Sequence, residues 1–249
     1  MKEERRQFFE RIDEDQCRDY ILSQCSKNYE KVKSSLERLM DNCFVFDSPW
    51  DMEPCSKMHQ IQPMAWNQFF EDDPEWAYML NRQEYLLQFM VGYLVEGDKN
   101  YIQKCKFFLF DWIEQVREFS PQSLMTRTLD MGIRSFTWLK LLLLLLKFDL
   151  LEEEELEKIL ASLEKQIHFM REHYRAKYTL SNWGILQTIP MLAIYHFFSD
   201  KMDLEEVYLF ASEELKKQIE TQILEDGSQF EQSILYHVEV YKALLDLCI

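Results

Sequence analysis

Long stretches with helical periodicity, separated only by short turns, fill the chain from Glu75 to its end. Apolar side chains recur there at intervals of three and four residues, which is the spacing of one face of an α-helix. The 249 residues include only 5 glycines and 6 prolines, so few positions interrupt a helix. We therefore predict an all-α fold, with helices at about 75–96, 99–119, 129–148, 152–175, 182–198, 203–223 and 228–248.

The predicted helices alternate in character along this part of the chain. Segments 129–148 and 182–198 are strongly apolar, whereas segments 152–175 and 203–223 are acidic. Short turns make consecutive helices pack antiparallel, so the apolar helices would form an inner layer and the acidic helices an outer layer. The pattern predicts an incomplete (α/α) toroid of antiparallel helical hairpins. An α-solenoid would alternate similarly, but no fixed repeat of about 34 to 40 residues is visible.

The chain before Glu75 divides into two further parts. Residues 1–42 show helical periodicity at about 4–22 and 26–41. Residues 43–74 are rich in proline and contain Trp50 and Trp66, which predicts an aromatic loop packed on the body. Residues 75–249 would then form the toroid segment. A chain with 47% hydrophobic residues can bury a large core, so all three parts fit one structural domain.

The formal net charge of -16 limits the partners of this chain. A polyanion such as nucleic acid would be repelled, so no nucleic-acid partner is predicted. Acidic runs such as Leu151–Leu156 are typical of solvated helix faces. A site for an acidic ligand would require local basic groups, for which Arg127 and Arg134 are the candidates.

No segment has the character of a membrane span or a signal peptide. The run Leu141–Leu146 lies between two lysines and is far shorter than the ~20 apolar residues of a spanning helix. The N-terminus is charged and lacks an apolar core, so the chain as given is expected to be cytoplasmic. The 6 cysteines include no Cys-x-x-Cys pair and are predicted to be mostly reduced and structural.

The segment Asp226–His237 sets polar residues into an otherwise apolar stretch. Ser228, with Glu231 three residues later, fits a capping box and predicts a helix that starts there. Gln229 and Tyr236 would then belong to a polar stripe along that helix. This polar stripe is the catalytic candidate of the sequence.

Further motifs precede this segment in the order Asp73–Arg82, Gly97-Asp98, Arg127–Arg134 with Trp138, and Ser181-Asn182. With these motifs, the chain from about Trp50 onward resembles the heparinase II/III group of polysaccharide lyases. The resemblance implies the N-terminal toroid domain of an enzyme that cleaves uronic-acid-containing polysaccharide or oligosaccharide by β-elimination, without a cofactor. In that family a C-terminal β-sheet domain follows the toroid, and this chain, which ends at Ile249, is expected to lack it.

By this resemblance, Asn182 neutralises the uronate carboxylate and Tyr236 acts as acid and base. The substrate-binding candidates are Arg127, Arg134, Trp138, Trp183, Gln229 and His237. The chain departs from the family pattern at Trp183, where many members have a histidine, and at Gln187, where an acidic residue is frequent. No metal site is predicted, because His168 and His173 are five residues apart and do not share a helical face.

The candidate residues also have structural interpretations, and two other function classes stay open. Asn182 is a preferred type of N-cap, and Asp130 with Arg134 would brace a helix at i, i+4. A glycoside hydrolase would require two carboxylates roughly 5 to 10 Å apart, for which Asp130 and Glu231 are the pair. A non-catalytic helical module that binds carbohydrate or protein is the other alternative.

Overall fold

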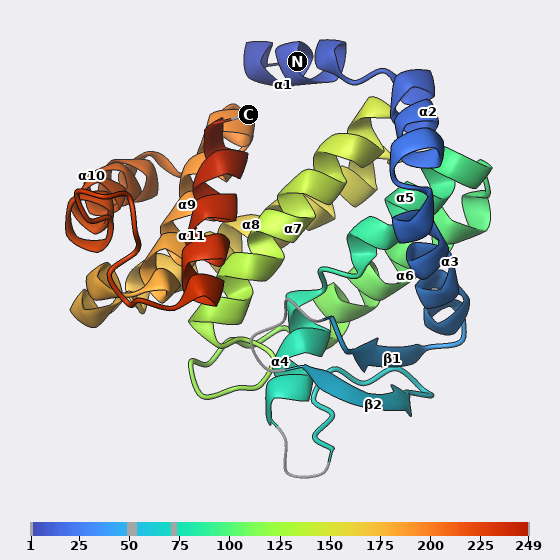
Figure 1. The fold of residues 1–249 in the computed structure, drawn as a ribbon, viewed down its shortest axis with the longest axis horizontal. Helices are drawn as coiled ribbons and strands as arrows, with labels where there is room; N and C mark the ends of the chain where they lie inside the picture. The colour runs from blue at the N-terminus through green and yellow to red at the C-terminus, as the bar shows by residue number, and fades with distance from the viewer. Residues whose placement is uncertain (1, 49–53, 71–73, 249) are drawn as a thin grey trace.

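The computed structural model describes residues 2–48, 54–70 and 74–248. Within these ranges the chain forms eleven α-helices, one 3-10 helix and one two-stranded sheet (Figure 1). The elements are α1 (Glu3–Arg11), α2 (Glu14–Gln24), α3 (Ser26–Met40), β1 (Cys43–Phe46), β2 (Cys55–Gln60), α4 (Pro74–Arg82), α5 (Leu86–Glu96), α6 (Lys99–Gln115), α7 (Thr128–Lys147), α8 (Glu153–Glu172), η1 (Ala176–Leu180), α9 (Asn182–Phe198), α10 (Glu205–Gln222) and α11 (Ile234–Cys248).

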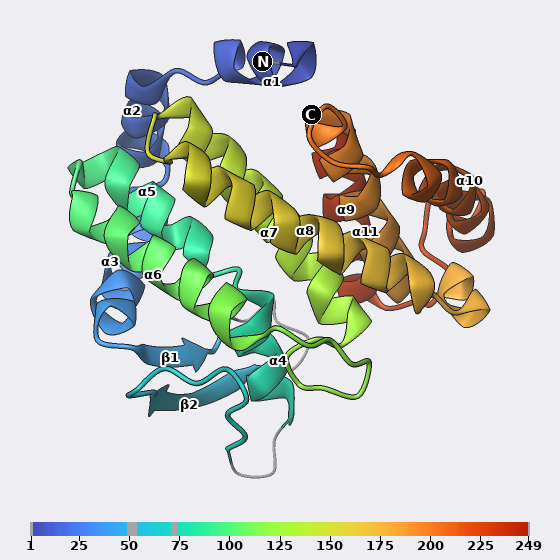
Figure 2. The same ribbon diagram turned by 180° about the vertical axis from the view of Figure 1, so that it is seen from behind.

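The helical hairpins α5–α6, α7–α8 and α9–α10 pack side by side in chain order. Helix α7 contacts α4 and α5 on one side and α9 on the other, and α11 packs against α9. Figure 1 shows α5 and α7 in front of α6 and α8, and Figure 2, from behind, shows α6 and α8 nearest the viewer. The apolar helices α7 and α9 therefore lie in contact with each other, while the acidic helices α8 and α10 cover them from outside.

Two predicted helices are each divided in the structure, for different reasons. The helix predicted at 4–22 ends at Ile12, because Asp13 caps a new helix and accepts a hydrogen bond from the Gln16 N–H at 2.9 Å. The helix predicted at 75–96 breaks at Gln83, which has a left-handed φ of 58°. The Gln83 side chain accepts a hydrogen bond from Trp138 Nε1 at 2.7 Å, and this contact holds the break.

The region predicted to be an aromatic loop contains a β-hairpin instead. Strands β1 and β2 pair antiparallel, with Phe44 opposite His59, and Phe44 is fully buried. Trp66, which follows the hairpin, is only 1% exposed and donates a hydrogen bond to Asp111 at 2.8 Å. Trp50 lies outside the described residues. The hairpin is thus packed on the helical body through its aromatic side chains.

Helix α1 lies across one end of the molecule, between α2 and the C-terminal end of α9 (Figure 1). Arg5 is 4% exposed and pairs with Asp200 through two hydrogen bonds at 2.8 and 2.6 Å. Lys2 reaches the carbonyl oxygens of Tyr195 and His196 near the end of α9. Cations at a helix C-terminus are favourable, so these contacts fasten α1 to the body.

The core runs through α3 to α9 and contains the leucine run of α7, whose Leu141 is fully buried. Among the described residues, no helix is both long and apolar enough to cross a bilayer. Cys55 and Cys105 are buried, and they are free thiols, as are Cys17, Cys25 and Cys43.

Candidate active site

The segment after α10 forms a turn and an extended loop rather than the start of a helix. Asp226 Oδ1 accepts hydrogen bonds from the Ser228 N–H at 2.9 Å and from the Ser228 hydroxyl at 2.6 Å. Gly227 has a left-handed φ of 83°, a conformation that glycine adopts without steric strain. The predicted capping box between Ser228 and Glu231 is therefore wrong, and α11 begins only at Ile234.

The Glu231 carboxylate binds the N-terminus of α9 instead. Its Oε2 atom accepts hydrogen bonds from the Asn182 N–H and Nδ2–H, both at 3.1 Å. Ser181, the N-cap of α9, makes no capping hydrogen bond with its side chain, so Glu231 supplies this function from a distant loop. Asn182 is 3% exposed, and its Oδ1 is buried with no partner among the described residues.

Gln229 and His237 support the same loop. Gln229 Nε2 donates to Glu231 at 2.7 Å, and Gln229 Oε1 accepts from the Glu231 N–H at 2.9 Å. The Gln229 N–H donates to His237 Nδ1 at 3.2 Å, which assigns the proton of the neutral ring to Nε2. Gln229 is only 2% exposed and lies in the loop, so its predicted place on a helical stripe is wrong. In this structure it contacts the loop rather than a site for substrate.

Tyr236 lies in the first turn of α11 and is half-buried. Its hydroxyl makes no hydrogen bond to any described residue. Glu239, one turn further along α11, lines a cavity of about 500 Å³ together with Asn182. Because α9 and α11 also pack against each other, the structure brings together the two elements that carry Asn182 and Tyr236.

Arg127 stacks on aromatic rings next to the start of α9. Its guanidinium carbon lies 3.4 Å from the ring centroid of Tyr78 and 5.2 Å from that of Trp183. Its Nε and Nη2 donate to the two oxygens of Asp130 at 2.5 and 3.0 Å. The Arg127 side chain remains 20% exposed. Since Trp183 directly follows Asn182, three of the predicted site residues lie in one region.

Asp130 links this stack to a second arginine. The Asp130 side chain is fully buried and accepts a hydrogen bond from Arg82 Nε at 2.8 Å. Arg82 Nη2 also pairs with Glu75 at 2.7 Å. Burial lowers the pKa of Arg82, but the carboxylates of Asp130 and Glu75 outweigh burial and raise this pKa above its ordinary value. Arg82 and Arg127 with Asp130 and Glu75 therefore form a charge-balanced cluster.

Arg134 does not reach this region. It is fully buried, and its Nη1 donates to the carbonyl oxygens of Asn81 at 2.7 Å and Met125 at 3.1 Å. Its Nε donates to Gln166 at 2.9 Å, and burial lowers its pKa to about 9. The prediction that Arg134 binds substrate is therefore wrong for this structure. The alternative brace with Asp130 is wrong as well, because Asp130 accepts hydrogen bonds from Arg82 and Arg127.

Trp138 is also fully buried, so the prediction that it binds substrate is wrong for this structure. Its ring packs edge-to-face on Trp112 with centroids 5.4 Å apart, and its Nε1 holds Gln83 at the break between α4 and α5. Arg134 lies 4.0 Å from the Trp112 ring centroid. These residues build the support under the candidate site and do not face a ligand.

The sequence profile of the family described as Heparinase II/III N-terminus matches residues 15–248. The chain belongs to this family. A heparan sulfate lyase mutant from Pedobacter heparinus has a similar fold, with a TM-score of 0.67 at 17% sequence identity over 87% of this chain and 33% of that one. A heparinase III with methylated lysines gives a TM-score of 0.63 at 17% identity, over 87% of this chain and 35% of that one.

This member of the heparinase II/III family therefore spans about a third of the length of the two solved structures. Their similarity confirms the predicted fold, an incomplete toroid of helical hairpins. No curated protein matches the chain.

Each cation that lines the Asn182 cavity is ion-paired within the part of the chain that the structure describes. Arg82 pairs with Asp130 and Glu75, Lys140 with Asp246, and Lys242 with Glu239. A ligand carboxylate entering this cavity would therefore compete with internal carboxylates for every basic group. The Asn182 cavity thus offers hydrogen-bonding groups but no positive charge that lacks an internal carboxylate partner.

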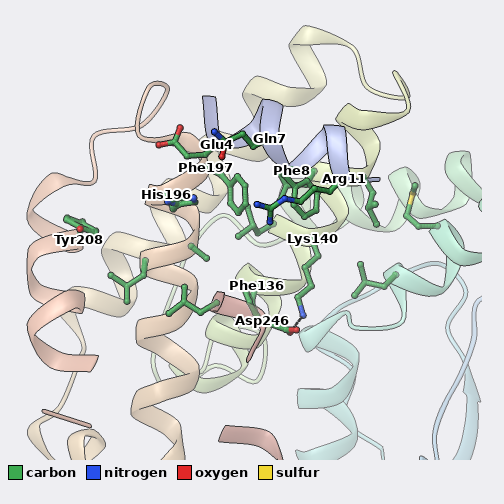
Figure 3. A pocket seen from close by; sticks show the side chains of 18 of the residues that line it. Glu4, Gln7, Phe8, Arg11, Phe136, Lys140, His196, Phe197, Tyr208 and Asp246 are labelled. Atoms are coloured by element: carbon green, nitrogen blue, oxygen red, sulfur yellow. Dashed lines mark hydrogen bonds and ion pairs between the residues drawn. The ribbon is translucent and has the colours of Figure 1, made fainter. Parts of the chain in front are cut away.

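An adjoining hollow of about 970 Å³ has a different character. It lies between α1 and helices α5, α7 and α9, and its lining is mostly apolar (Figure 3). The ion pair of Lys140 and Asp246 lines both the hollow and the Asn182 cavity, and Figure 3 shows it beside Phe136. Sugar hydroxyls require polar partners, so the Asn182 cavity is the candidate carbohydrate site.

Two contacts of the site, those of Tyr78 and Glu231, were not predicted from the sequence, although the position of Tyr78 follows from helical spacing. Tyr78 shares a face of α4 with Glu75 and Arg82 through spacings of three and four residues, which would have placed its ring beside these charges. The contact of Glu231 with Asn182 had no local signal. Among the described residues, no group of three His, Cys, Asp or Glu side chains is placed to hold a metal ion.

Proposed function

We propose that this chain forms the toroidal part of a polysaccharide lyase that cleaves uronic-acid-containing polysaccharide or oligosaccharide by β-elimination. One observation carries the proposal: hydrogen bonds join Asn182 through Glu231 to the loop that leads into α11, and α11 carries Tyr236. The family resemblance gives these two residues the carboxylate and proton-transfer roles. A fold shared with a heparan sulfate lyase supports the same class of substrate.

The proposed reaction uses Asn182 and Tyr236 at neighbouring atoms of one sugar ring. The Tyr236 phenolate removes the C5 proton, the electron pair forms the C4=C5 double bond, and the C4–O bond breaks. Negative charge that develops on the carboxylate is stabilised by the second Nδ2 hydrogen of Asn182. The phenol then gives its proton to the leaving oxygen, which restores the phenolate. A tyrosine can perform this only beside a cation or a strong donor.

The stack of Tyr78, Arg127 and Trp183 is proposed to contact the sugar next to this centre. Aromatic faces suit the apolar faces of pyranose rings, and Arg127 Nη1 has no hydrogen-bond partner among the described residues. Its other guanidinium donors are held by Asp130. Arg127 would therefore donate one hydrogen bond to a hydroxyl or carboxylate rather than clamp a carboxylate with two.

From the local charge we expect this chain alone to act weakly on an acidic polymer. Arg82 and Arg127 contribute +2, and Asp130, Glu75 and Glu231 contribute -3, so the formal sum of these five groups is -1. Additional basic groups from outside this chain would be required for strong binding of a polyanion. The C-terminal β domain expected from the family resemblance is the proposed source.

The test follows formation of the C4=C5 double bond by ultraviolet absorbance, with the chain in excess over heparan sulfate, alginate or an unsaturated oligosaccharide. We expect slow cleavage by the wild-type chain and a loss of about 100-fold or more in Tyr236→Phe, as for other lost acid/base groups. Tyr241→Phe is the matched control, because Tyr241 lies on the same helix and is 58% exposed. Equal rates in wild type and Tyr236→Phe would exclude Tyr236 from proton transfer.

A non-catalytic binding module is the second candidate function. The observation that favours it is an exposed apolar stripe on α11, with Ile234 at 84%, Tyr241 at 58% and Leu245 at 44% exposure. Such a stripe suits a protein surface better than a polysaccharide. No double-bond formation with any of the three substrates, together with unchanged behaviour of Tyr236→Phe, would favour this candidate over the lyase.

A further inference from the structure

Three N–H donors converge on a single oxygen of Glu231. Oε2 accepts from the Asn182 N–H at 3.1 Å, from Asn182 Nδ2 at 3.1 Å and from Gln229 Nε2 at 2.7 Å. Two of these donors belong to the residue proposed to bind the substrate carboxylate. The third comes from the loop that leads into α11. Glu231 is therefore the only described side chain that contacts both Asn182 and this loop through hydrogen bonds to its carboxylate.

We propose that Glu231 is a positioning residue that sets the amide orientation of Asn182. An asparagine amide has a donor end and an acceptor end of nearly equal shape, so its neighbours decide which end faces which way. A carboxylate only accepts hydrogen bonds, and it therefore selects the NH₂ end. This inference deepens the proposed function and rests on it for the identity of the ligand.

The orientation of the amide decides whether a uronate is attracted or repelled. With Nδ2 held by Glu231, its second hydrogen remains to donate to a ligand carboxylate. A flipped amide would present Oδ1, whose partial negative charge repels a carboxylate. The present orientation leaves Oδ1 buried and unpaired, which is unfavourable by itself. The Glu231 carboxylate offsets this cost, because its hydrogen bond to Nδ2 stabilises the present orientation of the Asn182 amide.

Glu231 also couples Asn182 to the helix of Tyr236. Gln229 and Glu231 exchange two hydrogen bonds, one in each direction, so the loop and the carboxylate hold each other in place. The Gln229 N–H reaches His237, the residue next to Tyr236, at 3.2 Å. Loss of the Glu231 carboxylate should therefore change the position of Asn182 relative to the first turn of α11, in addition to the orientation of the Asn182 amide.

The first measurement does not depend on catalysis. It follows the side-chain amide protons of Asn182 by NMR in ¹⁵N-asparagine-labelled protein, with the signals assigned from Asn182→Ser. We expect Glu231→Ala to shift these signals and to speed their exchange with solvent by about tenfold or more, because hydrogen bonds to charged groups are strong. Glu231→Gln retains an oxygen acceptor and should give an intermediate result. Glu225→Ala, an exposed change in the same loop, is the matched control.

The second measurement is the β-elimination rate on heparan sulfate. We expect Glu231→Ala to lower kcat/KM by about tenfold or more, by the same hydrogen-bond argument, and Glu231→Gln to recover part of the loss at unchanged thermal stability. If Glu231→Ala does not fold, Glu231→Gln against Glu225→Ala decides both measurements. Asn182 amide signals that are unchanged in the Glu231 variants would overturn the inference. A faster reaction in Glu231→Ala would overturn it too, because the carboxylate would then be blocking the site.

The two hypotheses fail separately. If the wild-type chain forms no double bond, the proposed lyase activity fails, while the amide signals still show whether Glu231 positions Asn182. If the wild-type chain cleaves and the amide signals are insensitive to Glu231, the positioning role fails and the lyase activity stands.

Discussion

Replacing Asp130 by asparagine should destabilise the protein by about 3 kcal/mol, near the lower end of the range for breaking a buried ion pair. The fully buried Asp130 carboxylate accepts hydrogen bonds at 2.5 and 3.0 Å from Arg127 and at 2.8 Å from Arg82. The variant leaves both cations without this negative charge. Three features reduce the loss: asparagine keeps one oxygen acceptor, Arg82 keeps Glu75, and the 20%-exposed Arg127 can be hydrated.

For a domain of this size, each kcal/mol lowers the melting temperature by about 2–4 °C, so Asp130→Asn should lower it by about 6–12 °C. Urea denaturation followed by circular dichroism would give the free energy of unfolding directly. Asp15→Asn is the control, because Asp15 also pairs with an arginine but is 85% exposed, and its loss should stay within about 0.5 kcal/mol. A loss below about 1 kcal/mol in Asp130→Asn would refute the reasoning that this cluster needs its central charge.

Two further predictions concern the close approach under α9 and the attachment of α1. A Cβ atom at Gly184 would lie 2.1 Å from the Tyr178 carbonyl oxygen, so Gly184→Ala should lower the free energy of unfolding by about 1–3 kcal/mol. An unchanged melting temperature would contradict this close approach. The hydrogen bond from Arg5 lowers the pKa of Asp200 below 3.8, so its stabilisation of α1 is present above that pH and is lost as the pH falls through the lower folded-state value. Hydrogen exchange of the α1 amides should accelerate in that range, and Asp200→Asn should abolish this pH dependence.

Local sequence patterns specify most of the helical framework. The helices predicted at 129–148 and 182–198 are observed at Thr128–Lys147 and Asn182–Phe198. Their backbone hydrogen bonds join residues four apart, and their apolar faces repeat every three or four residues, so local spacing contains the required information. The layered packing of hairpins followed from the same patterns, because short connections leave little choice other than antiparallel neighbours.

Tertiary packing, rather than local spacing, sets which polar groups are buried and which stay partly exposed. Arg134 and Arg127 are both arginines of one motif, but Arg134 is fully buried among carbonyl oxygens while Arg127 stays partly exposed on Tyr78. The break at Gln83 depends on Trp138, 55 residues away, and the loss of the capping box depends on Asn182, 49 residues from Glu231. Spacing along the chain describes neighbours within a few turns. Burial and hydrogen-bond partners across such separations arise from the packing of whole helices, which local patterns do not specify.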